Sequence, residues 1–290
     1  MVLTVVLAVL AAFANAAGSV LQRAGARKQP RGDGLSVGVL RALVTTPVWV
    51  LGVATMLAGF VLQAAALATG PIVLVQPIMV AELAFTLVLS GPVFHTRLRG
   101  RDWVAAVGMA ASVGVLLFAL APGGGDPRRV PALVWLLGCT VTVACVALLV
   151  VAGRRNSHAH HAAFLGTAAG LWFGFTAVLM AGVTAALTAG GVPALFKAWQ
   201  TYAMVVAGPT GFFLLQTALR AGRLVAAQPG LVLANPLVAL GWGLVVFGEH
   251  VRGGPWIAVE LVAAAALAGC TVLLAGSPLL RDEDPARQPA

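Results

Sequence analysis

The sequence predicts an all-α fold, a polytopic membrane helix bundle with about nine transmembrane helices in two inverted repeats. The first observation behind this prediction is composition: 60% of the 290 residues are hydrophobic and 9% are charged, whereas a soluble domain carries about 25% charged residues. The second is a block of apolar helices that occurs twice. A soluble core could not hide this much apolar surface, so the bilayer must act as the solvent.

The repeated block is identified by polar and aromatic landmarks within apolar sequence. Its first copy contains Leu62-Gln63, Gln76-Pro77, Phe94, Leu98-Arg99-Gly100 and Trp103. The second copy, 152 or 153 residues later, contains Leu215-Gln216, Gln228-Pro229, Phe247, Val251-Arg252-Gly253 and Trp256. Each copy is predicted to hold a helix broken by proline, and duplicated blocks with broken helices are typical of membrane transporters.

Nine stretches approach the 20 or so apolar residues that a spanning helix needs. They are 2–21, 42–68, 71–94, 103–121, 131–152, 162–188, 200–219, 224–247 and 256–275. Most of the 18 lysines and arginines then fall on one side of the membrane, the exceptions being Arg128, Arg129, Lys197 and Arg252. The positive-inside rule therefore predicts a multi-pass protein of the plasma membrane with its N-terminus outside and its C-terminus in the cytoplasm.

An odd span between two four-helix blocks inverts the second block relative to the first. The predicted organisation is a first repeat over 1–122, a linker span and cytoplasmic loop over 123–161, a second repeat over 162–275, and a disordered cytoplasmic tail over 276–290. Inverted repeats build outward-open and inward-open states from one set of helices. A chain that carries both halves could work as a monomer or as a homodimer.

The sequence resembles the drug/metabolite transporter (DMT) superfamily in four segments. They are residues 18–23, 64–77, 215–219 and 225–229. The pattern is nearest to the NIPA-like branch, whose nine-span layout is similar, and more loosely EamA-like. EamA-type families carry an acidic residue where the penultimate helix of each half ends; here the second half has Glu249 and the first has Thr96. The resemblance implies transport, and the NIPA-like branch is associated with magnesium.

Glu82 is the sharpest candidate for a substrate-binding side chain. It lies roughly 16 Å along its predicted span at 1.5 Å per residue, close to the bilayer midplane. A carboxylate at that depth costs roughly 2.5–3.5 kcal/mol on insertion scales. Two interpretations stay open: a proton or cation site that faces a cavity, or a protonated glutamate that is hydrogen-bonded to a neighbouring helix.

The Gln-Pro pairs predict hydrogen-bonding groups at a similar depth. A proline disrupts the helical bond to the carbonyl four residues before it, so Pro77, Pro229 and Pro236 are candidate hinges. The freed carbonyls need a partner or a water-lined cavity, and Gln76 and Gln228 each add a donor and an acceptor there. The alternative is a kink that serves packing alone.

Further amides are candidates for the same binding site: Asn235, Gln63, Gln216 and Asn15. Asn235 aligns within one residue of Glu82 across the repeat, so the symmetric partner of the acid is a neutral amide. Asn15 lies in the first span, where it could face the same cavity or hold two helices together.

Two groups of small residues indicate close packing or bending. Gly166, Gly170 and Gly174 recur every four residues and predict a face for close helix contact. Gly208 and Pro209 are expected to interrupt the span 200–219, either as a hinge for alternating access or as a packing kink.

These residues favour a secondary transporter of a small organic solute, coupled to protons through Glu82. A divalent-cation pathway of the magnesium type is the alternative, although magnesium prefers octahedral oxygen ligands that include one or two carboxylates. A membrane scaffold without transport is the third hypothesis. The chain has no nucleophile with a base, no metal-ligand spacing at its three cysteines and no phosphate-binding loop, so we expect no enzyme, metal or cofactor. The net charge of +9 indicates membrane orientation rather than a nucleic-acid partner.

Overall fold

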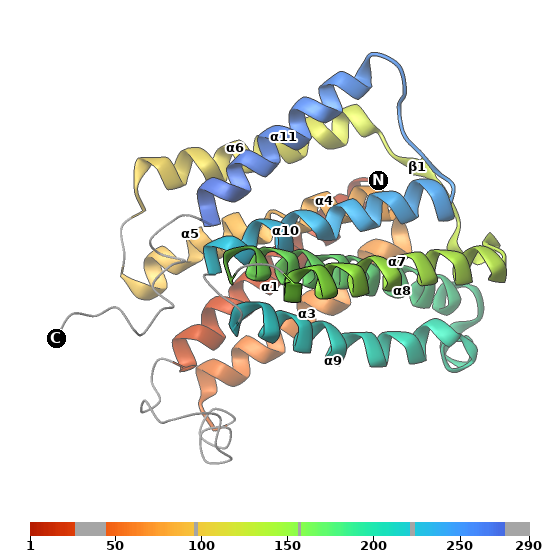
Figure 1. Cartoon of the computed structure of the whole chain (residues 1–290), viewed down its shortest axis with the longest axis horizontal. Coiled ribbons are helices and arrows are strands. Elements are labelled where there is room, and N and C mark those ends of the chain that lie inside the picture. Colours follow the sequence, from red (N-terminus) through yellow and green to blue (C-terminus); the bar gives the residue numbers. More distant parts are fainter. Residues whose placement is uncertain (27–44, 96–97, 156–157, 221–223, 276–290) are drawn as a thin grey trace.

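The computed structural model describes residues 1–26, 45–95, 98–155, 158–220 and 224–275. Helices make up nearly all of the described chain, which confirms the predicted all-α class (Figure 1). The predicted tail 276–290 lies outside the described residues, and so do Thr96 and the side chains of Gln228 and Pro229.

The helices follow the order of the predicted spans. The first half holds α1 (Val2–Ala26), α3 (Pro47–Thr69), α4 (Ile72–Met79), α5 (Glu82–Phe94) and α6 (Gly100–Leu120). The linker holds strand β1 (Gly123–Gly124), the 3-10 helix η1 (Pro127–Arg129) and α7 (Ala132–Arg155). The second half holds α8 (His158–Lys197), α9 (Trp199–Arg220), α10 (Leu224–Gly241), the π-helix η2 (Trp242–Val246), strand β2 (Glu249–His250) and α11 (Trp256–Ala275).

Seven helical segments of the described chain are long and apolar enough to cross a membrane. One of them is the stretch Ile72–Phe94, which joins α4 to α5. The other six are α1, α3, α6, α7, most of α8, and α11. The chain is therefore a polytopic membrane helix bundle. The other two predicted spans form α9 and α10–η2, and the apolar stretch in the latter, Gly230–Val246, is shorter than a typical span.

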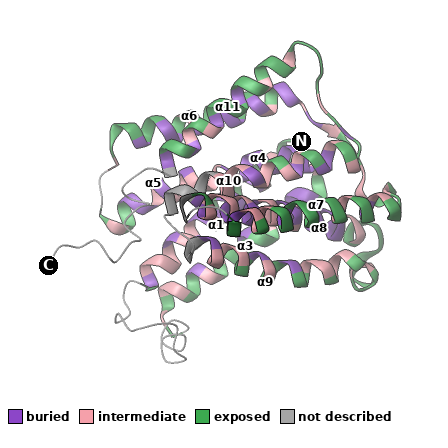
Figure 2. Cartoon of the chain, in the orientation of Figure 1, coloured by how far each residue is buried: buried purple, intermediate pink, exposed green. Residues whose placement is uncertain are grey.

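Two segments form the centre of the bundle. In α4–α5 and in α8, 61% of the most apolar window is buried, against 17% in α7 and 22% in α11. Exposed residues line the outer sides of α6, α7 and α11 (Figure 2). Large apolar side chains such as Phe118, Leu148 and Val262 are exposed there, as expected for helices that face lipid.

The two halves share one packing scheme. Helix α1 lies antiparallel to α3 and parallel to α5, and α8 lies antiparallel to α9 and parallel to α10. For example, Gly18 lies against Met56 and Gly25 against Trp49, so α1 and α3 run in opposite directions. The last helices of the two halves, α6 and α11, pack side by side and antiparallel along one edge of the molecule (Figure 1).

The predicted small-residue face of α8 is confirmed. Gly166, Gly170 and Gly174 all lie against the backbone of α10, and a methyl group added at any of them would collide with a backbone carbonyl. The absence of side chains lets the two helix axes approach closely. This contact fixes α10 against the central helix of the second half.

The irregular points of the second half differ from those expected. Helix α9 runs through Gly208 and Pro209 without a break, so the predicted interruption is wrong. The helix loses one backbone bond at Pro209 and continues. The break lies instead in α8, where Gly191 has φ 65° and ψ −162°, a conformation essentially restricted to glycine. The break divides α8, so its long first part ends close to residue 188, as predicted, and a short helical segment continues to Lys197.

The linker helix α7 packs on an aromatic cluster of the second half. Trp135 of α7 lies 5.3 Å from Trp199, 5.2 Å from Trp242 and 5.5 Å from Phe247, measured between ring centroids. The indole of Trp242 also donates a hydrogen bond to the Thr142 hydroxyl at 3.0 Å, in a buried setting. Helix α7 is thus attached to the π-helix η2.

We expect Thr142→Val to destabilise the protein by about 1–3 kcal/mol, because the buried indole N–H of Trp242 would lose its acceptor. Thr140→Val is the matched control, since the Thr140 hydroxyl is exposed and bonds only within its own helix. The measurement is the midpoint of detergent-induced unfolding for both variants. Equal midpoints for Thr142→Val and the wild type would contradict the role of this bond.

Candidate functional site

The helix that carries Glu82 is broken beside it. Helix α4 ends at Met79, Val80 and Ala81 follow, and Glu82 begins α5. Across this break the amides of Val80, Ala81 and Leu83 donate to carbonyls three residues back, at 3.0–3.3 Å. Helix α4 continues through Pro77, so the helix is not interrupted at the proline itself, and the tighter turns lie after it. The amide that Pro77 lacks concerns the carbonyl of Val73, four residues before it.

In the second half, the prediction of a proline-broken helix is wrong. Helix α10 continues through Pro229 and Pro236 to Gly241 and then widens into the π-helix η2. Isolated π-helical turns are frequently found at functional sites. The two halves therefore place their irregular backbone at different positions, although their sequences align.

Glu82 is paired with a side chain from the first helix. Its carboxyl group is hydrogen-bonded to the side chain of Asn15. Gly59 of α3 lies directly behind Asn15, so closely that a methyl group there would overlap the Asn15 amide oxygen. Next to them, the Phe13 and Phe85 rings meet edge to face with centroids 5.7 Å apart. Three helices thus converge on the predicted acid.

We expect Gly59→Ala to destabilise the protein by about 1–3 kcal/mol, the usual cost of overpacking, and to displace Asn15 from Glu82. Gly114→Ala is the control, because nothing lies within 4 Å of a methyl group at Gly114. Thermal unfolding of both variants in the same detergent measures the difference. Equal melting temperatures for the two variants would mean that the Asn15–Gly59 contact does not fix the position of the Asn15 side chain.

Gln76 is the most unusual polar residue of the described chain. It is 1% exposed, and neither its Nε2 nor its Oε1 has a hydrogen-bond partner among the described residues. The Oδ1 atom of Asn235 is buried without a partner in the same way. Buried polar groups almost always find partners, so an unsatisfied amide at a helix break is suited to a bound solute or water.

The other predicted site residues are distributed around this centre. Gln63 on α3 and Gln216 on α9 are half-buried, and Gly208 and Pro209 lie on the exposed side of α9. Gln228 and Pro229 belong to α10, but their side chains lie outside the described residues. The structure therefore joins Glu82 to Asn15 and places Gln76 six residues before Glu82, on α4.

Glu249 has a larger role than the sequence predicted. Glu249 had no place in the site predicted from the sequence, but its side chain is 6% exposed. Its Oε1 accepts a hydrogen bond from the Ile72 amide at 2.8 Å, and its Oε2 accepts one from the Val73 amide at 2.9 Å. Burial raises the pKa of the Glu249 carboxyl, and the two amide hydrogen bonds offset this only in part. The family-like acid at the end of the penultimate helix was the signal in the sequence.

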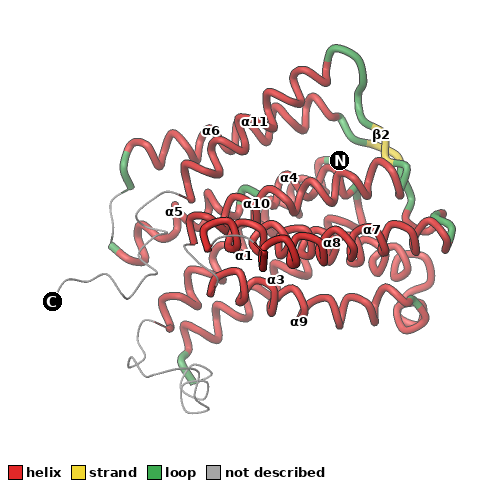
Figure 3. The backbone as a smooth tube through the Cα atoms, viewed as in Figure 1, coloured by secondary structure: helices red, strands yellow, loops and turns green. Residues whose placement is uncertain are grey.

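A short antiparallel ribbon holds Glu249 in place. Gly123 pairs with His250 and Gly124 with Glu249, which ties the linker to the end of η2 (Figure 3). Gly124 has φ 68°, in the left-handed region that favours glycine. The ribbon crosses between the two halves at the first turn of α4.

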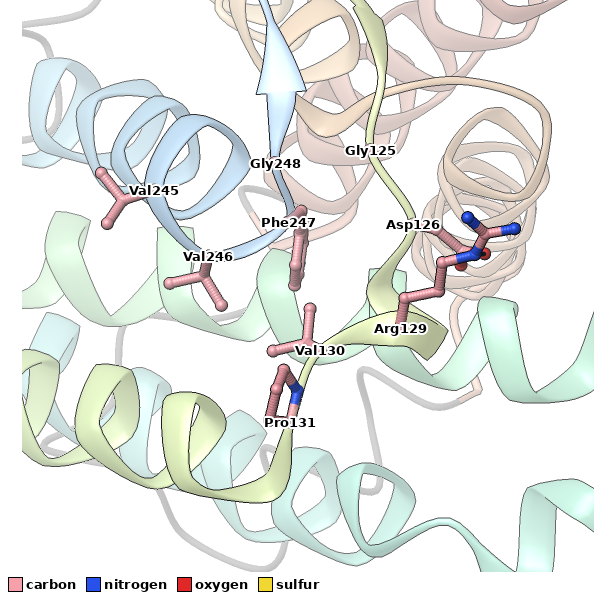
Figure 4. A pocket seen from close by; sticks show the side chains of 9 residues that line it. All are labelled: Gly125, Asp126, Arg129, Val130, Pro131, Val245, Val246, Phe247 and Gly248. Atoms are coloured by element: carbon pink, nitrogen blue, oxygen red, sulfur yellow. Dashed lines mark ion pairs between the residues drawn. The ribbon is translucent and has the colours of Figure 1, made fainter.

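Two pockets lie beside the ribbon. The larger, of about 500 Å³, lies between η1, the start of α7 and the end of η2. Figure 4 shows Phe247, Val130 and Pro131 on one side of it and the Asp126 and Arg129 side chains on the other. The smaller, of about 240 Å³, adjoins Glu249, Pro71 and Ile72. At its rim, Arg128 forms an ion pair with Asp126 at 2.9 Å and thereby lowers the pKa of Asp126.

The metal-binding potential of the described residues is small. No group of three His, Cys, Asp or Glu side chains among them could hold a metal ion. Glu82 has the Asn15 amide as its neighbour, and Glu249 is occupied by two backbone amides. The pair Glu82–Asn15 and the buried amide of Gln76 on the preceding helix are called the polar centre below.

Comparison with known proteins gives a relative but no family. A Corynebacterium glutamicum protein described as uncharacterized is 29% identical over 283 residues, which cover 95% of this chain and 98% of the relative. No protein-family model matches the chain, and no solved structure matches it. The match includes both halves and the linker, so the similarity extends over the whole architecture.

Proposed function

We propose that the protein is a secondary transporter of the drug/metabolite type that moves a small organic solute, with Glu82 as its proton-binding group. The observation that carries this proposal is Gln76, a fully buried amide without a partner beside a broken helix. Irregular backbone at membrane depth is tolerated where it lines a cavity or is buried in protein. A packing kink alone would not require a polar, unsatisfied side chain at that point.

The packing of the helices supports an inverted repeat. The equivalent helices α6 and α11 run antiparallel and in contact, which is the relation that a two-fold axis in the membrane plane produces. The central helices α1 and α8 each pack against the same set of neighbours in their own half. We propose nine spans on this basis, with the N-terminus outside and the C-terminus in the cytoplasm of the cell.

Thermal stability of the purified protein tests the proposal. A panel of metabolites, organic cations and divalent ions is measured at acidic and at alkaline pH, for the wild type and for Glu82→Gln. We expect an organic compound to raise the melting temperature in a pH-dependent manner in the wild type only. A shift with magnesium alone would favour a divalent-cation pathway, and no shift with any compound would favour a membrane scaffold.

A further inference from the structure

The first turn of α4 is held by a carboxylate from the other half of the molecule. Glu249 accepts hydrogen bonds from the amides of Ile72 and Val73 at 2.8 and 2.9 Å. The first amides of a helix have no partner within the helix, and negative charge is favourable at this end. Hydrogen bonds to an ionised group are roughly twice as strong as neutral ones. This contact is therefore a strong attachment between the halves.

The opposite end of α4 is a break. The helix has eight residues, Ile72–Met79, and Val80 and Ala81 separate it from α5. It is about 12 Å long at 1.5 Å per residue. Val80 and Ala81 keep right-handed helical dihedral angles, but their amides donate to carbonyls three residues back, with the poorer geometry of a 3-10 turn. These two residues are therefore the weakest point between α4 and α5, where α4 can bend relative to α5.

A pocket adjoins the attached end. It has a volume of about 240 Å³, and its lining residues include Gly70, Pro71, Ile72, Asp126, Thr188 and Glu249. Gln76 lies one helical turn further along α4 and is buried at 1% exposure. The pocket therefore touches the first turn of α4 and its Glu249 cap, and Gln76 lies one turn further along the same buried helix.

We propose that α4 is a gate helix and that Glu249 is the residue that holds it closed. While the carboxylate caps Ile72 and Val73, the pocket is separated from Gln76. When the cap is released, α4 turns about Val80 and Ala81 and joins the pocket to the polar centre. This inference rests on the proposed transport function, because a gate requires a passage.

A buried cysteine reports the state of the gate. Val75 lies on α4 and is 0% exposed, so Val75→Cys in a background without Cys139, Cys145 and Cys270 should react slowly with a water-soluble thiol reagent. In Glu249→Gln, a side-chain NH2 group takes the place of one carboxylate oxygen. A donor then faces the backbone N–H of Ile72 or Val73, and one hydrogen bond is lost. Loss of a hydrogen bond to a charged group shifts an equilibrium by about tenfold or more, and we expect the cysteine to react faster by that factor. The reagent is applied to both sides of reconstituted vesicles.

Two further variants complete the experiment. Glu260→Gln is the control. Glu260 is also a carboxyl with a buried oxygen that lacks a partner, but it lies on α11. Its substitution should leave the rate of the thiol reaction unchanged. Gly243→Ala serves if Glu249→Gln does not fold: its methyl group would lie 2.7 Å from Glu249 Oε2 and should raise the rate in the same way. Rates equal to the parent in both Glu249→Gln and Gly243→Ala would overturn the gate.

The gate and the transport function can fail separately, because the thiol reaction is measured without any solute. A faster reaction in Glu249→Gln together with no stabilising compound in the panel would show that Glu249 holds α4 in place and would refute the transport function. An unchanged reaction rate together with a compound whose stabilising effect depends on pH in the wild type but not in Glu82→Gln would refute the gate and support transport.

Discussion

Glu82→Gln should abolish proton-coupled flux while the protein remains folded. The substitution keeps the size of the side chain and a hydrogen bond to Asn15, but it removes the group that binds a proton. Proton transfer by a positioned side chain is worth about a hundredfold or more, and we expect flux in reconstituted vesicles to fall by that factor. The compound used is the one selected by the thermal panel.

The control for this prediction is Glu260→Gln. Glu260 is a carboxyl on the peripheral helix α11, and it contributes a buried oxygen without a partner. Its neutralisation should leave flux at the wild-type level. In addition, the compound should stabilise Glu82→Gln equally at acidic and alkaline pH. Wild-type flux in Glu82→Gln would show that the Asn15–Glu82 pair is only a structural contact.

Gly170→Leu should prevent folding of the second half. A side chain at Gly170 would collide with the carbonyl oxygens of Gly230 and Leu231 on α10. Backbone atoms cannot move aside as a flexible side chain can, and overpacking typically costs about 1–3 kcal/mol even where repacking is possible. We expect little or no monodisperse protein after detergent extraction, measured by size-exclusion chromatography.

Gly269→Leu is the matched control for this loss. Gly269 lies on the exposed side of α11, and nothing lies within 4 Å of an added methyl group there. The same side chain at this position should leave the yield and the melting temperature near the wild-type values. A normal yield of Gly170→Leu would mean that α8 and α10 can separate without loss of the fold.

Composition and periodic small residues were sufficient to predict the fold class. Apolar runs of spanning length follow from the thickness of the bilayer, and the stripe at Gly166, Gly170 and Gly174 predicted a close helix contact that the structure confirms. Proline was a weaker guide. Pro77 precedes a real break, whereas α9 and α10 continue through Pro209 and Pro236, because one missing amide bond can be tolerated within a packed helix.

Candidate site residues could be named from the sequence only where a polar side chain falls deep within a predicted membrane span. Glu82 and Gln76 are costly in lipid, so their residue type alone made them candidates, and Asn15 was expected either in the same cavity or in a helix contact; the structure pairs it with Glu82. Glu249 could not be placed by the same reasoning. It lies in a segment between helices, and its burial depends on the β1–β2 ribbon and on the start of α4, 177 residues away in sequence.

That separation has a consequence for biosynthesis. Helix α4 leaves the ribosome long before Glu249 does, and 177 residues separate the two. At a synthesis rate of about 5–20 residues per second, the wait is on the order of ten seconds or more. During this time the first amides of α4 must be satisfied by water, lipid headgroups or the insertion machinery. The ribbon and its Glu249 cap can therefore form only when most of the second half has been made and α11 alone is still to follow, and a chain truncated before Glu249 would leave the first turn of α4 uncapped.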